Sequence, residues 1–326
     1  MNNYTCEICG NKATLSISGL FDDRYGALGK HSIYTCNSCG FGKTLPGIPR
    51  NKIADFYSRH YPTSHFTVAQ VTKSVHIPSA FRTWLSGLDC NLYLYTKPRE
   101  KVLDIGFGSG VSLLAIRQLG GIPYGIEPDP SVKDIAKHLN LPIHIGFITD
   151  NPFPKLKFDL ITASQVLEHE PDPLSFLLAT KKKLAKNGRV VLSLPNYNAL
   201  YRTVFGHKWL HWHVPYHLNF FTHKSLKILV KNAGFNIHKI RTITPTAWTV
   251  WQLHMIFAKT KEGEISTAWD TIVSGGDTSQ SVFKRRIYYI LNISLEIMLT
   301  PINRIIDMFQ LGESFLVELI PIENKS

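Results

Sequence analysis

Short apolar runs alternate with segments of helical periodicity through the middle of the chain. Five runs have the length and composition of buried strands: 101–105, 123–126, 143–145, 158–163 and 189–194. Between them, apolar residues recur at helical spacing in three segments: 111–119, 131–139 and 173–184. This alternation predicts an α/β fold, in which helices cover both faces of a parallel sheet. Two later runs, 235–243 and 314–321, predict a sixth and a seventh strand.

An insertion separates the last two of these strands. Within it, residues 287–299 form a mostly apolar helical segment that we expect Pro301 to end, and a second apolar pattern covers 302–309. The longer apolar segment is well short of the ~20 residues that span a bilayer. No membrane-spanning helix is therefore expected.

The basic run from Lys284 to Arg286 precedes the apolar segments of the insertion. Basic residues beside an apolar helix can place that helix on an anionic membrane, so peripheral contact through 284–309 is one interpretation. The other is a helical hairpin that packs on the core or on a second copy of the chain. Glu296 and Asp307 interrupt the basic face and favour this second interpretation.

Composition narrows the functional class less than the pattern does. The 326 residues include 36 Lys and Arg against 24 Asp and Glu, and 44% are hydrophobic, which argues against a disordered chain. The net charge of +12 suits nucleic acid, an anionic membrane or an anionic small substrate. Residues 241–326 carry 8 basic and 9 acidic side chains, so the basic excess belongs to the first 240 residues.

The first residues are polar and already contain cysteines, which is unlike a secretory signal. We therefore expect a cytoplasmic protein, peripheral at the inner face of the membrane if 284–309 contacts lipid.

Four cysteines predict a metal site near the N-terminus. Cys6 and Cys9 form one C-x-x-C pair, Cys36 and Cys39 form another, and each pair is followed by glycine. Two such turns supply the four thiolates that structural zinc prefers, within a ribbon of β-hairpins. Disulfides or redox thiols are the alternative, which the absence of a signal sequence disfavours. Cys90 is left over and is expected to be a small buried side chain.

A glycine-rich turn follows the first core strand. It reads Asp104-Ile-Gly-Phe-Gly-Ser-Gly110 and leads into a helix, where glycines allow a ligand to approach the backbone closely. Val111 stands where a dinucleotide fingerprint has its third glycine, so a nicotinamide cofactor is disfavoured. Glu127 ends the second strand, where a carboxylate can accept hydrogen bonds from ribose hydroxyls.

Three segments, 102–110, 124–128 and 158–169, resemble successive motifs of the class I S-adenosylmethionine-dependent methyltransferases. The resemblance implies a seven-stranded Rossmann-like sheet with helices on both faces and an antiparallel last strand. It also implies roles for individual residues. The methionine part of the cofactor would lie against Asp104, Gly106, Phe107, Gly108 and Gly110, the ribose against Glu127, the adenine against Phe147 and Ile148, and the methionine end and substrate cleft against Ser164 and Gln165.

Histidine and aromatic residues are dense between 201 and 223. The stretch 215–222, with helix and Gly-Phe after it, resembles a signature of bacterial methyltransferases of sugar and surface-polysaccharide biosynthesis, a group that often carries an N-terminal cysteine ribbon. His217 is the first candidate for a general base, followed by Tyr216 and His169. Alternatively, His217 caps the helix that begins near Lys224. The segment suits an active-site wall better than a second metal site, because it contains no carboxylates and aromatic residues interleave with its histidines.

The pattern along the chain, together with the resemblance, suggests five parts. These are a zinc ribbon (1–45), a helical lid or linker (46–96), a cofactor-binding core (97–243), a helical apolar insertion (244–312), and a final strand and tail (313–326). In the lid, Tyr57 and Tyr61 lie in a tyrosine-rich segment that could contact cofactor or substrate.

We expect a methyltransferase that acts on a small acceptor such as a nucleotide- or lipid-linked sugar. One alternative is an RNA methyltransferase whose ribbon docks on RNA. Residues 1–40 carry three cations and three carboxylates, a balance that makes a nucleic-acid partner unlikely. The other alternative is a module that binds the cofactor or a partner without catalysis. The sequence leaves the oligomeric state and the methylated atom open.

Overall fold

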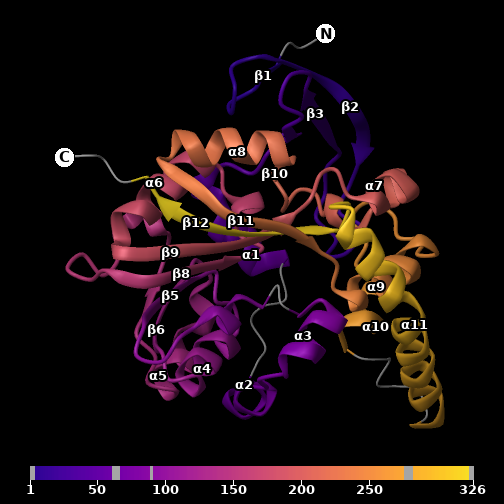
Figure 1. The fold of residues 1–326 in the computed structure, drawn as a ribbon. Coiled ribbons are helices and arrows are strands. Elements are labelled where there is room, and N and C mark those ends of the chain that lie inside the picture. Colours follow the sequence, from indigo (N-terminus) through magenta and orange to yellow (C-terminus); the bar gives the residue numbers. More distant parts are fainter. Residues whose placement is uncertain (1–3, 61–66, 89–90, 275–281, 323–326) are drawn as a thin grey trace.

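A seven-stranded sheet forms the centre of the computed structural model, which describes residues 4–60, 67–88, 91–274 and 282–322 (Figure 1). The strand order is β11-β12-β9-β8-β5-β6-β7. The strands are β5 (Lys101–Ile105), β6 (Ile122–Glu127), β7 (Ile143–Ile145), β8 (Phe158–Ser164), β9 (Leu184–Pro195), β11 (Phe235–Ile243) and β12 (Ser314–Pro321). Strands β5 to β9 are parallel, and β12 is antiparallel to both of its neighbours. The predicted sheet and its antiparallel last strand are confirmed.

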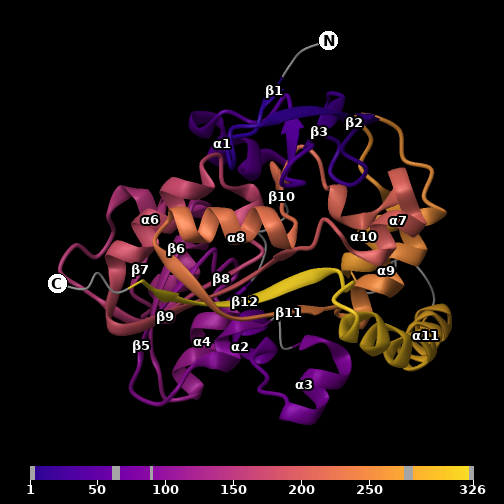
Figure 2. The ribbon, with the colours of Figure 1, turned by 45° about the horizontal axis from the view of Figure 1, so that its top comes forward.

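Helices cover both faces of this sheet (Figure 2). They are α4 (Val111–Gln118) and α5 (Lys133–His138) on one face, and α6 (Pro173–Lys183) and α8 (His223–Asn232) on the other. Adjacent residues of a strand point to opposite faces, so Val102 packs in the α4 core and Leu103 in the α6 core. Short 3-10 turns complete the connections: η3 (Leu92–Tyr95), η4 (Pro130–Val132), η5 (Ile148–Asp150), η6 (Leu167–His169), η7 (Gly206–Lys208) and η8 (Leu210–Trp212).

The cysteine-rich N-terminal module, residues 4–45, is a second, antiparallel sheet that we call the ribbon. Its strands are β1 (Tyr4–Thr5), β2 (Lys12–Leu20), β3 (His31–Cys36) and β4 (Gly42–Leu45). A fifth strand, β10 (Asn219–Phe220), comes from the segment after the core strands and pairs with β4. The hairpins were predicted, but the strand shared with the core was not. The ribbon is therefore built into the rest of the fold by main-chain hydrogen bonds.

Three helices connect the ribbon to the core sheet. They are α1 (Arg50–His60), α2 (Val68–Ser74) and α3 (Ala80–Ser86). Helix α2 contacts α4, and α3 contacts α11. Tyr61 and Cys90 lie outside the described residues, as does the side chain of Tyr57, so the expectations for them stay predictions.

The insertion consists of α9 (Thr246–Ile256), α10 (Thr267–Ser274) and α11 (Val282–Met308), with a further short helix, α7 (Leu200–Phe205), nearby. The expectation that Pro301 ends a helix is wrong, because α11 continues through it for 27 residues in all. The Thr300 hydroxyl donates to the Glu296 carbonyl, and the residues after the proline pack on the protein. These tertiary contacts outweigh the local cost of the proline. No helix in the described part of the chain is both long and apolar enough to cross a bilayer.

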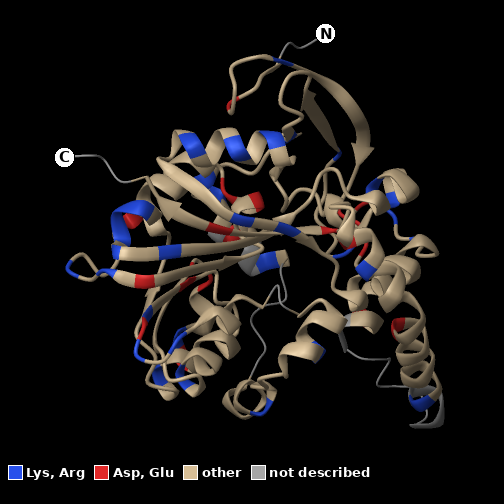
Figure 3. Cartoon of the chain, viewed as in Figure 1, with Lys and Arg blue, Asp and Glu red and all other residues tan. Residues whose placement is uncertain are grey.

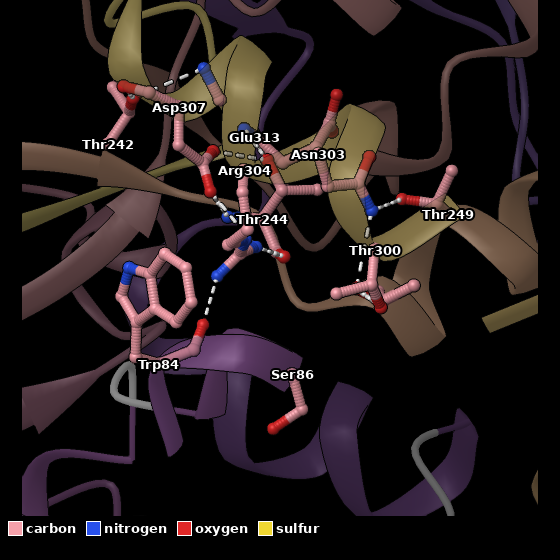
Figure 4. A network of polar contacts seen from close by, with 12 residues as sticks. Trp84, Ser86, Thr242, Thr244, Thr249, Thr300, Asn303, Arg304, Asp307 and Glu313 are labelled. Atoms are coloured by element: carbon pink, nitrogen blue, oxygen red, sulfur yellow. Dashed lines mark hydrogen bonds and ion pairs between the residues drawn. The ribbon is translucent and has the colours of Figure 1, made fainter. Parts of the chain in front are cut away.

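Polar residues in the C-terminal part of α11 face the protein, as Figure 4 shows for Asn303, Arg304 and Asp307. Arg304 donates to the main-chain carbonyl of Trp84 in α3 at 2.6 Å and forms an ion pair of 2.9 Å with Asp307. Asp307 accepts from the hydroxyl of Thr244 at 2.8 Å, and Asn303 donates to that of Thr249 at 2.9 Å. A buried polar network therefore joins α11 to α3, α9 and the end of β11.

The outward face of α11 is apolar. Ile290, Ile297 and Ile305 are 52%, 70% and 55% exposed. Few charges appear along this helix (Figure 3). Asp307 is buried and Glu296 is half-buried. The sequence pattern suggested that these two carboxylates interrupt the outward face, but neither of them does.

Candidate functional site

A cavity of about 280 Å³ opens at the carboxyl edge of β5, β6 and β8. We call it the first cavity. Of the residues expected to bind cofactor, seven line it: Gly106, Gly108, Glu127, Phe147, Ile148, Ser164 and Gln165. This edge is where open α/β sheets bind their ligands, because the glycine-rich turn exposes main-chain groups there.

The turn after β5 needs glycine for two separate reasons. Gly106 has a φ of 73°, and a Cβ there would lie 2.5 Å from the Val166 side chain. Gly108 has a φ of 54° and open space around it, so a ligand can approach its backbone. The Gly108 amide donates to Glu127 Oε2 at 2.9 Å, which links the turn to the end of β6.

Glu127 presents a buried carboxylate to the first cavity. Besides Gly108, the Asp129 amide donates to it, at 3.2 Å to Oε1. Burial raises the pKa of Glu127 to about 7, although these two amides favour the ionised form. Asp129 and Glu170 also line the cavity and were not expected there. The carboxylate is thus positioned to accept hydrogen bonds from a ligand inside the cavity.

Asp104, Phe107 and Gly110 lie behind the first cavity and support its shape. Thr162 donates to the Asp104 carboxylate at 2.6 Å, and burial raises the pKa of Asp104 to about 6. The Phe107 ring packs where a Cβ on Gly125 would stand. Gly110 is the N-cap of α4, with a φ of 93°. Their cofactor roles stay predictions.

Helix α1 closes one side of the first cavity. Ile53 lines the cavity, and the Arg50 guanidinium lies 5.1 Å from the centre of the Phe147 ring. Arg50 also donates to Thr149 and lies 3.7 Å from Asp150. A cation above an aromatic face is attracted to it, so these contacts hold α1 against the 147–150 segment.

A second cavity of about 190 Å³ adjoins the first. The two share Gln165 and His169. The ribbon, the histidine-rich segment and the insertion supply the other lining residues: Arg24, Tyr25, Leu210, His211, His213, His217, Trp248, Trp251 and Trp269. Three tryptophans and four histidines make this a largely aromatic compartment next to the first cavity.

Gln165 separates the two cavities in an unusual backbone conformation. Its φ is 54°, in the left-handed region that non-glycine residues rarely adopt. Its amide donates to the Ser193 carbonyl at 2.8 Å, and the Ser193 hydroxyl lies 2.9 Å from that of Ser164. Strained residues of this kind cluster at functional sites, where the surrounding structure compensates their cost.

His169 and His217 face each other, with ring centres 4.7 Å apart. Nδ1 of His217 lies 2.7 Å from the His211 carbonyl oxygen, and Nδ1 of His169 lies 2.9 Å from that of Tyr216. Burial lowers the pKa of His169 to about 4 and that of His217 well below its usual value. Both imidazoles are therefore neutral at physiological pH.

The alternative role for His217, capping the following helix, is not what the structure shows. The N-cap of α8 is Thr222, whose hydroxyl accepts from the Ser225 amide at 3.1 Å. Tyr216 is fully buried and lines neither cavity, and its hydroxyl lies 3.4 Å from an Asp22 carboxylate oxygen. Tyr216 thus supports the wall from behind, and its catalytic role stays a prediction.

The four ribbon cysteines converge. Sγ of Cys6 lies 3.6 Å from that of Cys39, and Sγ of Cys9 lies 3.4 Å from that of Cys36. All four sulfur atoms lie within 4.8 Å of one another. Four thiols at this separation could hold one metal ion, and four sulfur ligands are the set that structural zinc prefers.

The sequence did not single out the tryptophans of the insertion or Glu168. Trp248 and Trp251 lie three residues apart in α9, on the face toward the histidine-rich segment, but helical spacing alone fits ordinary core packing equally well. Glu168 precedes His169 in sequence, yet its proximity to His217 depends on the tertiary fold.

Comparison with known proteins agrees with this geometry. A family model described as "Methyltransferase domain" matches residues 79–240. The mitochondrial ubiquinone biosynthesis O-methyltransferase of Schizosaccharomyces pombe is 34% identical over 104 residues, which are 29% of this chain and 37% of that protein. The Haemophilus ducreyi ubiquinone biosynthesis O-methyltransferase is 34% identical over 119 residues, 32% of this chain and 50% of that protein. The chain thus spans half or less of the length of these relatives.

Among solved structures, the [4+2]-cyclase SpnF has a TM-score of 0.50 and 13% identity, and the match covers 86% of this chain and 99% of that one. This likeness concerns the fold alone, and a fold does not determine the reaction. The assignment of a methyltransferase domain rests on three more specific observations. They are the family match, the glycine-rich turn and the cavity that this turn lines. Residues 79–240 thus match the methyltransferase-domain family, with the fold that the resemblance to the class I S-adenosylmethionine-dependent enzymes implies.

Proposed function

We propose that this protein transfers the methyl group of S-adenosylmethionine to a hydroxyl oxygen of a small, ring-bearing acceptor. The observation that carries the proposal is the junction at Gln165 and His169, where the first cavity meets the aromatic second cavity. A cofactor in the first cavity would direct its methyl group toward an acceptor in the second. Direct displacement requires this in-line arrangement.

The lining of the second cavity favours a neutral, flat acceptor. Trp248, Trp251 and Trp269 offer ring faces and edges, which aromatic groups pack against favourably. The lining cation, Arg24, stacks at 4.5 Å over Trp269 and donates to the Leu210 carbonyl. An anionic phosphate would therefore find little free positive charge in this cavity. The O-methyltransferase names of the relatives support oxygen as the methylated atom.

A nucleotide- or lipid-linked sugar is the second candidate acceptor. The basic excess of the first 240 residues favours it, because a phosphate outside the cavity would meet positive charge there. In that case the sugar ring would occupy the second cavity. The two candidate acceptors are a phenol and a sugar hydroxyl. They can be distinguished by measuring methyl transfer to each.

The test is transfer of labelled methyl to two panels of acceptors, phenols with a ring hydroxyl and sugar nucleotides. We expect turnover with the first panel. Gly108→Val, which fills the space next to the glycine-rich turn, should remove cofactor binding and turnover together, whereas Gly19→Val in the ribbon, also at positive φ with open space, should spare cofactor binding. Turnover of neither panel, with cofactor still bound, would overturn the proposal.

Zinc in the ribbon is proposed as a structural ion. The four thiols would satisfy its tetrahedral coordination, which leaves no open position for a substrate. Its chemistry would be to fix the two cysteine turns relative to each other. Elemental analysis should show that Cys36→Ser holds one tightly bound zinc fewer than the wild-type chain.

Peripheral contact with an anionic membrane is proposed for the outward face of α11. Arg286 lies at one end of that face, and Arg82 on the neighbouring α3 is also exposed. Exposed Phe81 and Trp84 of α3 extend the apolar surface. An apolar face of this extent, with basic residues beside it and its carboxylates turned inward, matches the charge of anionic lipid.

A further inference from the structure

We infer that Glu168, His169 and His217 form a second metal site, which binds a divalent cation at the wall shared by the two cavities. One atom from each side chain, a carboxylate oxygen or an imidazole nitrogen, lies within 4.8 Å of the other two. This site deepens the proposed function, because the cation would contact the acceptor hydroxyl. It is distinct from the four cysteines of the ribbon.

The carboxylate of Glu168 is the first reason. Its side chain is fully buried, and neither Oε1 nor Oε2 has a hydrogen-bond partner among the described residues. The nearest basic atom, His169 Nε2, is 4.0 Å from Oε1. A buried carboxylate without partners is costly, and coordination of a cation removes that cost.

The orientation of the two histidines is the second reason. The carbonyls of Tyr216 and His211 can only accept, so the ring protons of His169 and His217 must be on Nδ1. The lone pairs are then on the Nε2 atoms. Metal-binding histidines are commonly oriented in this way, with the other ring nitrogen donating to a backbone carbonyl.

The backbone around the site is rigidly held. The Leu218 amide donates to the Glu168 carbonyl at 2.8 Å, which ties the two ligand-bearing segments together. The Asn219 side chain donates to the carbonyl of Glu170 at 2.6 Å and also lies 3.3 Å from that of Glu168. These bonds fix the 168–170 turn against the segment that carries His217, as a metal site requires.

Two imidazoles and one carboxylate form a donor set typical of catalytic zinc, which keeps a further position open. The same set also suits other borderline divalent cations. His169 and His217 line the second cavity, so the open position would be reached from the acceptor side. Glu168 completes the set from behind the wall.

A cation there would favour ionisation of the acceptor hydroxyl, as it does for bound water. The hydroxyl proton leaves to solvent when the oxygen binds the cation. The oxygen then forms a bond to the methyl carbon of the sulfonium while the carbon–sulfur bond breaks. Sulfur keeps that electron pair and becomes a neutral thioether. Neutral histidines thus contribute as ligands rather than as the base.

The experiment is elemental analysis of the full chain after dialysis against zinc, together with calorimetric titration of S-adenosylmethionine. We expect two zinc ions per wild-type chain and one in Glu168→Gln and in His217→Ala. His207→Ala, in an exposed histidine of the same segment, should retain two. Cofactor affinity should change less than about twofold in each variant.

One zinc per wild-type chain, or two in both Glu168→Gln and His217→Ala, would overturn the site. Thermal unfolding shows whether each variant is folded, and His169→Ala provides a third test if one of them is not. Failure of the proposed function has a different signature: the second zinc is bound, but no hydroxyl acceptor turns over.

Discussion

The hydroxyl of Thr44 donates a hydrogen bond of 2.6 Å to the main-chain carbonyl oxygen of His217. The next residue, Leu218, accepts from the Thr44 amide at 3.0 Å, and Lys43 donates to the Asn219 side chain at 2.9 Å. The ribbon strand β4 therefore fixes the segment that carries the histidine wall of the second cavity. The ribbon acts on the site by positioning it.

Thr44→Val should reduce methyl transfer while leaving cofactor affinity unchanged. The substitution removes one donor and leaves the His217 carbonyl partly unsatisfied, at a cost of about 1 kcal/mol or more, equivalent to roughly fivefold in rate. Steady-state turnover and cofactor calorimetry measure the two effects. Thr14→Val is the matched control, because Thr14 is an exposed threonine of the same sheet. If both substitutions reduced methyl transfer equally, the ribbon would not position the His217 segment through Thr44.

Cofactor affinity should depend on pH through Glu127. Burial raises its pKa to about 7. Only the ionised carboxylate can accept hydrogen bonds from both ribose hydroxyls. Below pH 7 the carboxyl must release its proton before it binds the ribose, so affinity should fall up to about tenfold per pH unit. Calorimetry between pH 6 and 8 measures the slope. Glu127→Gln should bind more weakly and lose this dependence, and an unchanged slope would refute the assignment.

Trp248→Ala and Trp269→Ala should raise the KM for the acceptor and leave cofactor affinity unaffected. Each removes an aromatic wall of the second cavity but none of the first. An aromatic contact is worth about 1 kcal/mol beyond burial, so we expect at least a severalfold increase. Trp84→Ala is the control, since Trp84 lines neither of these cavities and is half exposed. If the substitutions changed cofactor affinity and not the KM for the acceptor, the acceptor would bind outside the second cavity.

Flotation with vesicles tests the outward face of α11. The chain should float with vesicles that contain an anionic lipid, and less with neutral ones. Ile290→Glu with Ile297→Glu should weaken binding by tenfold or more, because each buried isoleucine contributes about 1.5–3 kcal/mol. Val204→Glu, an equally exposed apolar residue of α7, is the control. Loss of self-association in place of vesicle binding would identify a second copy as the occupant.

Arg304→Ala should destabilise the fold by about 3–5 kcal/mol, because it removes one partner of a buried ion pair. Urea unfolding measures this difference. Arg59→Ala removes an exposed ion pair with Asp55 in α1 and should cost about 1 kcal/mol or less. Similar costs for the two arginines would mean that the network in Figure 4 contributes little to holding α11.

The sequence predicted those parts of the fold that short segments of the chain determine by themselves. Strands β5, β6 and β8 are short, mostly apolar runs, and Gly106 needs glycine because of its own φ and one neighbour, so both follow from short segments. The ribbon hairpins followed from the cysteine spacing for the same reason. The cofactor end of the site was therefore largely predictable.

The acceptor end was not, because its residues come from distant segments. The histidine-rich segment itself contains no carboxylate, yet Glu168 reaches His217 from η6, where the Leu218 amide donates to the Glu168 carbonyl. Pro301 was expected to end a helix, but contacts of Arg304 and Asp307 with other elements outweigh that local preference. Periodicity cannot show which elements meet in space.

The pairing of β10 with β4 also has a consequence for biogenesis. Lys43 and Asn219 are hydrogen-bonded across 176 positions of sequence. While the chain is being synthesised, the ribbon emerges before β10, and the β4 edge stays open until β10 leaves the ribosome. An open edge can pair with other chains, and distant pairings form slowly. The cysteine cluster, by contrast, is complete by residue 39, so an ion could stabilise the nascent ribbon throughout that interval.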